Sequence, residues 1–105
     1  MDDGSVMGVF ADGISWQGYS GLLHGGVIAS LLDGAMTHCL FALGCQAVTA
    51  ELKVRYRHPV MAAEKMTLRA WQQDGTWRLH VMQAELSQHG EVKAVATAKF
   101  VDRPI

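Results

Sequence analysis

The chain has 105 residues, half of them hydrophobic, which suits a single domain over residues 1–105 with a modest core. Nine basic and ten acidic residues give a formal net charge of −1, and no run of like charges occurs. This composition gives no indication of nucleic-acid binding or of an acidic disordered tail, and the small core favours a homo-oligomer.

Neither the cysteines nor the apolar segments indicate a metal site, secretion or a membrane anchor. Cys39 and Cys45 lack the spacing of zinc ligands, so we expect thiols in a reducing compartment, with no metal and no cofactor. The longest apolar stretch is interrupted by Asp33, Thr37 and His38, which we take as too polar for a membrane span, and the acidic N-terminus lacks a signal-peptide core. The sequence therefore predicts a cytoplasmic protein.

The first half of the chain predicts a strand, a loop and one long helix. Residues 5–10 form a short strand pattern, and residues 13–23 are rich in loop-forming glycine. From Gly26 to about Leu43 almost every residue is apolar or small. This pattern predicts a helix of about five turns, buried over most of its surface, which stops at Gly44.

The period of the pattern changes to two after this helix. Thr49–Arg57 alternates polar and apolar residues, which predicts a strand with one polar face. Its core face is expected to carry Ala50, Leu52, Val54 and Tyr56.

Three further alternating runs predict an antiparallel meander. They span roughly residues 64–73, 76–88 and 91–101, with turn signals at Asp74-Gly75 and His89-Gly90. No repeat or linker divides the chain. The predicted class is therefore α+β, with one sheet of about five strands around one long central helix.

The helix opens with two glycines, which has a chemical interpretation. A helix N-terminus presents unpaired N–H groups and a partial positive charge. Gly25 and Gly26 would let a carbonyl oxygen approach these groups and be polarised, as in an oxyanion hole. Alternatively, the glycines only make a tight entry into the helix.

A carboxylate inside the same apolar helix is the second indication of chemistry. Leaving Asp33 unpaired there would cost several kcal/mol unless it were solvated or hydrogen-bonded. Gly26, Ser30, Asp33 and Thr37 could form a solvent-facing polar stripe, but an ordinary exposed face would carry several Lys and Glu residues. We therefore interpret Asp33 as a nucleophile or a general base, which the sequence does not separate.

Two segments carry a family resemblance, HGGVIASLLDGAM and VTAELKVRYRHPV, within residues 18–60. His24-Gly25-Gly26, an acid nine residues after the histidine and a strand ending before Pro59 together resemble the hotdog-fold acyl-CoA thioesterases of the phenylacetate-pathway type. These belong to the 4-hydroxybenzoyl-CoA thioesterase superfamily. The resemblance implies a hotdog fold and hydrolysis of an acyl-CoA or acyl-carrier thioester.

The resemblance also implies roles for single residues. In the resembling enzymes the first glycine after the histidine supplies the polarising N–H, here Gly25, and the histidine, here His24, positions the thioester or holds the loop. Thr49 aligns with a hydroxyl residue that orients the attacking water in some relatives. Many relatives carry an Asn where this chain has Gly18, and Gln17 is the candidate to supply that amide.

Helix geometry predicts a dimer. Gly25 and Asp33 are eight residues apart, which places them roughly 12 Å apart along one helix. They cannot both act on one carbonyl, because each must lie near 3 Å from it, so they are expected to come from different subunits. A two-fold dimer with antiparallel helices would hold two such sites, and a dimer of dimers is expected.

A coenzyme A substrate would bring phosphates and an acyl chain. Lys53, Arg55, Arg57 and His58 form the basic cluster of the chain and, with Gly26, are the predicted substrate-binding residues. The alternative is an ordinary solvated strand face. The candidates for an apolar acyl slot are Trp16, Tyr19, Leu22, Leu23, Met36, Leu40 and Phe41.

Two other functions stay open. A hotdog dehydratase or hydratase would use His24 and Asp33 on the α and β carbons of an acyl thioester. A non-catalytic module that binds acyl thioesters is the other alternative, since Gly18 replaces the Asn. Neither nucleic acid nor membrane is expected as a partner.

Overall fold

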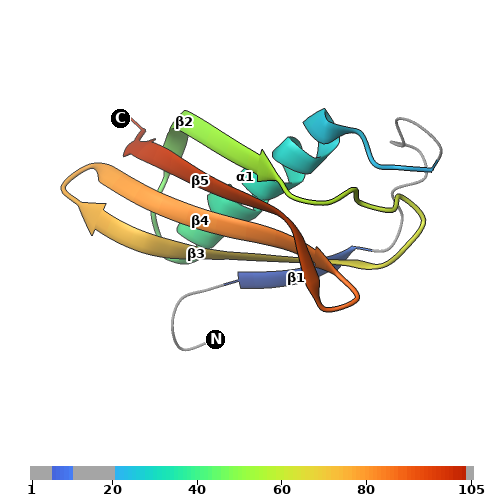
Figure 1. The fold of residues 1–105 in the computed structure, drawn as a ribbon. Coiled ribbons are helices and arrows are strands. Elements are labelled where there is room, and N and C mark those ends of the chain that lie inside the picture. Colours follow the sequence, from blue (N-terminus) through green and yellow to red (C-terminus); the bar gives the residue numbers. More distant parts are fainter. Residues whose placement is uncertain (1–5, 11–20, 104–105) are drawn as a thin grey trace.

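The computed structural model describes residues 6–10 and 21–103, which form one helix packed on one antiparallel sheet (Figure 1). The elements are β1 (Val6–Phe10), α1 (Gly25–Ala42), β2 (Ala47–Tyr56), β3 (Met66–Thr76), β4 (Leu79–Gln88) and β5 (Glu91–Asp102). The five strands lie in the order β1-β3-β4-β5-β2. The α+β class and the meander, now β3 to β5, are confirmed. The strand after the helix, β2, pairs with β5 at the far edge of the meander.

The helix ends where the sequence predicts, because the stop signal is local. Gly44 has φ +85°, a left-handed conformation that glycine adopts without strain. The Cys45 N–H donates to the Leu40 carbonyl at 2.9 Å, and the Gly44 N–H donates to the Phe41 carbonyl at 3.0 Å. These two bonds form a Schellman ending. The helix runs one residue earlier than predicted at both ends, Gly25–Ala42.

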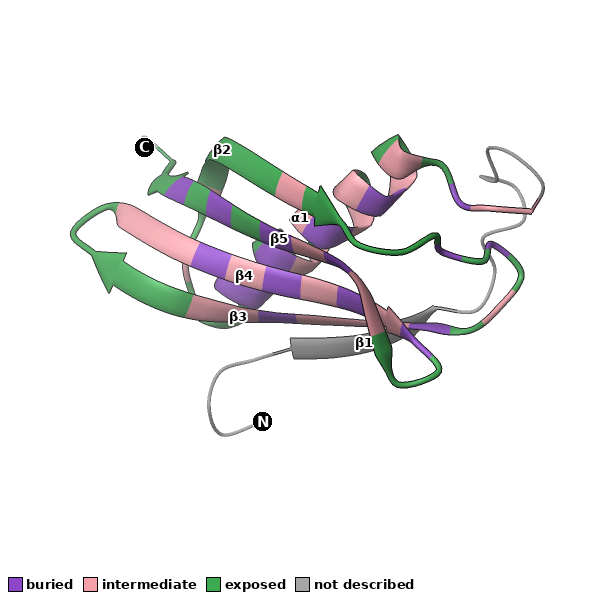
Figure 2. Ribbon diagram, in the orientation of Figure 1, coloured by how far each residue is buried: buried purple, intermediate pink, exposed green. Residues whose placement is uncertain are grey.

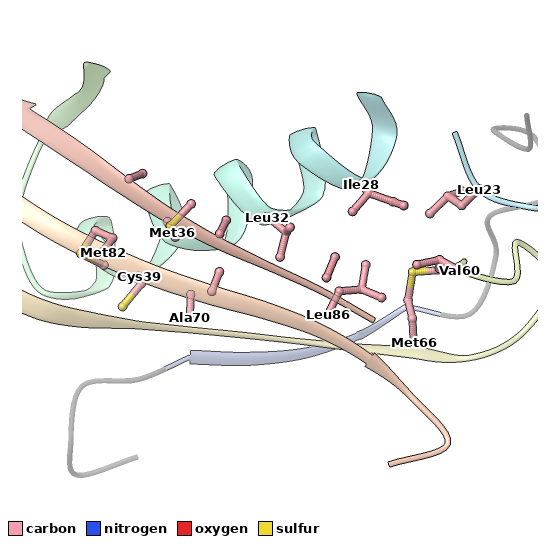
Figure 3. Packing of buried hydrophobic residues seen from close by; sticks show 14 of the residues in the cluster. Leu23, Ile28, Leu32, Met36, Cys39, Val60, Met66, Ala70, Met82 and Leu86 are labelled. Atoms are coloured by element: carbon pink, nitrogen blue, oxygen red, sulfur yellow. The ribbon is translucent and has the colours of Figure 1, made fainter. Parts of the chain in front are cut away.

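The hydrophobic core lies between α1 and the sheet (Figure 3). The buried face of the helix consists of Ile28, Leu32, Met36, Cys39 and Leu40. The inward positions of β3, β4 and β5 complete the core with Met66, Ala70, Met82, Ala84, Leu86, Ala94, Ala96, Ala98 and Phe100. The predicted burial of most of the helix surface is wrong for the single chain, because one helix on one sheet can cover only one of its faces.

β2 is an edge strand with a bulge, and it is mostly exposed (Figure 2). Its register with β5 shifts between Thr49 and Glu51, so that Ala50 has no partner. Thr49 lies opposite the buried Phe100 and therefore faces the helix. The predicted core face is thus wrong at Ala50, and its members Leu52 and Tyr56 stay exposed because no further element covers this edge.

The turn between β3 and β4 also differs from the prediction. It lies at Trp77-Arg78, where Arg78 has φ +65° and Trp77 is exposed. Asp74-Gly75 instead lies inside β3, directly after a register shift. The Asp74 side chain accepts a hydrogen bond from the Gly75 N–H at 2.8 Å. The hydrogen bond expected for a turn therefore stabilises the bulged backbone of β3 instead. The turn at His89-Gly90 is confirmed, with φ +52° and +75°.

The polar residues of α1 do not exclude a membrane span, contrary to the sequence prediction. The helix is 18 residues long with a mean hydropathy of 1.3, which is enough to cross a membrane by length and composition. Core helices meet the same criteria, and in this structure the apolar face of α1 packs on the sheet. Cys39 and Cys45 form no disulfide.

Candidate active site

The N-terminus of α1 presents one open hydrogen-bond donor. His24 caps the helix, and its Nδ1 accepts a hydrogen bond from the Gly26 N–H at 2.9 Å. The His24 carbonyl accepts from the N–H groups of Val27 and Ile28 at 3.0 and 3.1 Å. The Gly25 N–H has no acceptor among the residues that the structure describes. Gly25 rather than Gly26 therefore keeps an N–H for the oxygen of a ligand.

Neither glycine is required for its backbone conformation, because neither lies in the left-handed region, and only Gly26 is required for space. A Cβ on Gly25 would lie 3.6 Å from the ring of Tyr56, an ordinary contact. A Cβ on Gly26 would lie 3.2 Å from the His24 ring, which would have to shift. The capping histidine therefore depends on glycine at position 26.

A groove of about 330 Å³ opens beside the Gly25 N–H. It is lined by Leu22, Leu23, Gly25, Ile28, Tyr56, Arg57, His58, Pro59 and Val60. Two predicted acyl-slot residues, Leu22 and Leu23, and two predicted phosphate-binding residues, Arg57 and His58, thus meet at the helix N-terminus. The groove has both an apolar wall and two basic side chains.

A buried glutamine supports one wall of this groove. The Leu23 N–H donates to the Val60 carbonyl at 2.8 Å, which ties the entry of the helix to the segment after β2. Gln88, only 2% exposed, accepts from the Met61 N–H and donates to the Met61 carbonyl, both at 2.9 Å. No sequence pattern indicates this role, because the partners of Gln88 are backbone groups.

The predicted basic cluster lies partly on the outer face of the sheet, where Arg57 lines a hollow with Trp71 and Thr97 in addition to lining the groove. Lys53 and Arg55 lie opposite Thr97 and Val95 of β5, positions that alternate with the buried alanines. Their side chains therefore lie on the sheet face away from α1. Of the four basic residues, only Arg57 and His58 line the groove of the same chain.

One acidic side chain near the groove has a shifted pKa. Lys93 donates a hydrogen bond to Glu91 at 2.7 Å, and this bond with the lysine charge holds the pKa of Glu91 below its ordinary value of 4.5. His58, 3.8 Å from Glu91, acts in the same direction. Since the Lys93 carbonyl also accepts from the Arg57 and His58 N–H groups, this cluster adjoins the end of β2.

The second part of the site lies in the middle of α1. Asp33 is half-buried, and its Oδ1 accepts a hydrogen bond from the Thr49 hydroxyl at 2.8 Å. The bulge at Ala50 is what brings Thr49 to the helix side of β2. No partner for the second carboxylate oxygen occurs in the described part of the chain. Asp33 therefore has one oriented oxygen and one open oxygen.

A second hollow, of about 300 Å³, lies beside the C-terminal half of α1. It is lined by Thr37, Phe41, Cys45, Gln46, Ala47, Val48 and Arg103. Its Thr37 lies one helical turn after Asp33, and the Thr37 hydroxyl donates to the Asp33 backbone carbonyl at 2.9 Å. The prediction of Met36 and Leu40 as acyl-slot residues is wrong for the single chain, since both are fully buried in the core.

The remaining predicted residues either lie outside the described part of the chain or lie away from these two places. Gln17, Trp16, Tyr19 and Gly18 lie outside the described residues. Ser30 is exposed on α1, away from the sheet. His80 and His89 pair with Asp102 and Glu64 at 2.7 Å, and within residues 6–10 and 21–103 no group of His, Cys, Asp and Glu residues could hold a metal.

A family comparison bears on this geometry. The family model described as Thioesterase superfamily matches residues 20–95, well over half of the chain. The matched region includes the helix, Thr49, the groove and Gln88.

Individual relatives agree with the family. Acyl-coenzyme A thioesterase THEM4 of Mus musculus is 35% identical over 55 residues, which are 52% of this chain and 24% of that protein. The crystal structure of protein RHA08564, a thioesterase superfamily protein, is 32% identical, with a TM-score of 0.92 over 97% of this chain and 51% of that one. The chain thus spans about a quarter of the curated relative and half of the solved one.

More distant structures share the fold. A phenylacetic acid degradation-related protein from Ralstonia eutropha JMP134 has a TM-score of 0.87 at 23% identity, covering 95% of this chain and 77% of its own. A Streptococcus mutans UA159 protein bound to acetyl CoA has a TM-score of 0.89 at 20% identity, covering 96% and 82%. The predicted hotdog fold, an antiparallel sheet around one long central helix, is confirmed.

Proposed function

The chain belongs to the thioesterase superfamily, and from this premise we propose that it hydrolyses an acyl thioester to a free acid and a thiol. The Gly25 N–H would donate to the carbonyl oxygen as negative charge develops there. Asp33 would either attack the carbonyl carbon, giving an anhydride that water then hydrolyses, or take a proton from the attacking water. In both cases the C–S bond breaks and the leaving sulfur is protonated to the thiol.

One observation carries this proposal. A single helix presents an open N–H at its start, beside a groove, and a carboxylate with one open oxygen in its middle. A carbonyl addition needs such a donor and such a base or nucleophile. The hydrogen bond from Thr49 would hold the carboxylate in a fixed orientation.

The spacing of the two groups supports a dimeric site. Eight residues of helix separate Gly25 and Asp33 by about 12 Å, too far for one carbonyl. β2 pairs with β5 on one side, and its exposed Val48 and Leu52 are apolar. A second copy that covers this edge, with its helix antiparallel to α1, would place Gly25 of one subunit beside Asp33 of the other.

Coenzyme A is the carrier that we propose for the acyl group, with the reaction taking place in the cytoplasm. The mouse relative is named an acyl-coenzyme A thioesterase, and the Streptococcus mutans structure is bound to acetyl CoA. In this chain Arg57 and His58 stand at the groove and could pair with phosphates.

Release of free thiol from a panel of acyl-CoAs tests the proposal. We expect release by the wild-type protein and a loss of about 10²-fold or more in Asp33→Asn. Asp74→Asn is the matched control, because it changes an exposed acid on β3 and should keep full activity. Hydration of an enoyl-CoA without thiol release would indicate a lyase, and binding without turnover would indicate a binding module.

A further inference from the structure

The last residue of β2 is tied to the first residue of α1. The Tyr56 hydroxyl donates a hydrogen bond to the Gly25 carbonyl at 2.8 Å, across 31 residues of sequence. The Tyr56 ring also lines the groove, and it lies next to the space that a Gly25 side chain would fill. Tyr56 thus lines the groove and also holds the backbone at the start of α1. We call the hydrogen bond from its hydroxyl to the Gly25 carbonyl the brace.

This brace reaches His24 through one peptide unit. The Gly25 carbonyl and the Gly26 N–H belong to the same peptide, and that N–H donates to His24 Nδ1 at 2.9 Å. The two hydrogen bonds therefore point in one direction, from the phenol through the peptide to the imidazole. Hydrogen bonds in such a chain polarise and strengthen one another.

The chain of hydrogen bonds determines which nitrogen of His24 carries the proton. A neutral imidazole has one N–H, and because Nδ1 accepts, the proton is on Nε2. Nε2 lies on the other side of the ring, and His24 is exposed. No carboxylate of the described residues pairs with His24, so no acid competes in setting this tautomer.

We propose that Tyr56 is a positioning residue that holds His24 in its Nε2–H tautomer. The exposed His24 then presents an Nε2–H donor at the same helix start as the open Gly25 N–H, and it serves the substrate as a donor and not as a base. The effect of Tyr56 on turnover rests on the proposed thioesterase function, whereas its effect on the His24 tautomer is independent of that function.

Nitrogen NMR of ¹⁵N-histidine-labelled protein tests this directly, with the His24 signals assigned by their loss in His24→Asn. We expect the Nε2–H form in the wild type and a tautomer ratio shifted about three- to tenfold toward Nδ1–H in Tyr56→Phe, which removes only the hydroxyl. His38, exposed on the same helix, is the internal control and should not change.

Kinetics provide the second readout. We expect kcat to fall about three- to tenfold in Tyr56→Phe with little change in KM, whereas Tyr56→Leu, which also removes the ring from the groove, should raise KM as well. An Nδ1–H tautomer in the wild type, or an unchanged tautomer in Tyr56→Phe, would overturn the inference. If the wild type released no thiol, the proposal of hydrolysis would be contradicted. A tautomer shift in Tyr56→Phe would still support the role of Tyr56 in setting the His24 tautomer.

Discussion

The two ends of the candidate site are built from different parts of the chain. At the start of α1 the donor is a backbone N–H, and its position depends on the capping by His24 and the brace from Tyr56. In the middle of α1 the acceptor is one side chain, Asp33, oriented by Thr49. Most substitutions can move a backbone N–H but cannot remove it, whereas a single substitution removes the carboxylate of Asp33. Both ends depend on β2, the exposed edge strand.

The largest effect is expected where a substitution does delete the backbone donor. Proline is well tolerated at the first position of a helix, and the preceding His24 has φ −64° and ψ 140°, the extended conformation that proline requires. Gly25→Pro should therefore fold, with a ring carbon in place of the N–H. We expect a loss of about 10²- to 10³-fold in kcat.

Gly25→Ala is the matched control for this variant, because it keeps the N–H and adds a Cβ in ordinary contact with the Tyr56 ring. Steady-state kinetics with far-ultraviolet circular dichroism compare the two. Equal activity of Gly25→Pro and Gly25→Ala would mean that the N–H takes no part in turnover.

A smaller effect is expected at the acceptor end, where Asp33 remains but loses its orienting partner. Thr49→Val has the same shape as threonine without the hydroxyl, and it should lower kcat about tenfold. Thr49→Ser keeps the hydroxyl and should recover most of the activity. A Thr49→Val protein as active as the wild type would show that Asp33 needs no orientation.

The smallest effect concerns the pH dependence of stability near the groove. Glu91 has a pKa below 4.5 in the folded protein, mainly through its hydrogen bond from Lys93, so the folded state binds fewer protons than the unfolded state. Its contribution to stability is present above pH 4.5 and is lost as the pH falls through the lowered folded value. Because this pair is exposed, the contribution is small.

Thermal melting of the wild type and Glu91→Gln as a function of pH measures this contribution. The wild type should be slightly more stable at neutral pH, and the two curves should converge in acid. A difference that grows as the pH falls would contradict the assignment.

The sequence predicted the features that depend on local chemistry. Gly44 ends the helix because only its own conformation and the preceding turn are involved. The open donor at Gly25 follows from its place at a helix start. The carboxylate of Asp33 stands out because, with His38 neutral, Asp33 is the one charged residue of α1.

Features that depend on distant partners could not be predicted. Alternation through Ala50 placed Thr49 on the outer face, because a bulge leaves no signal in a pattern of polar and apolar residues. Gln88 and Tyr56 were missed as supports for the site since their partners are backbone groups far along the chain. Met36 was predicted to line the acyl slot because an apolar residue of the core and an apolar residue of a pocket look alike in a sequence. The structure places Met36 in the core.

The central claim is that one site takes Gly25 from one subunit and Asp33 from another, and mixed dimers test it most directly. Asp33→Asn and Gly25→Pro subunits, each inactive alone, are coexpressed with different tags, and dimers carrying both tags are counted by native mass spectrometry. Random pairing makes half of the dimers mixed, and each mixed dimer has one intact site, so we predict about a quarter of wild-type activity. Mixed dimers in that proportion with no activity above the parent variants would contradict the shared site.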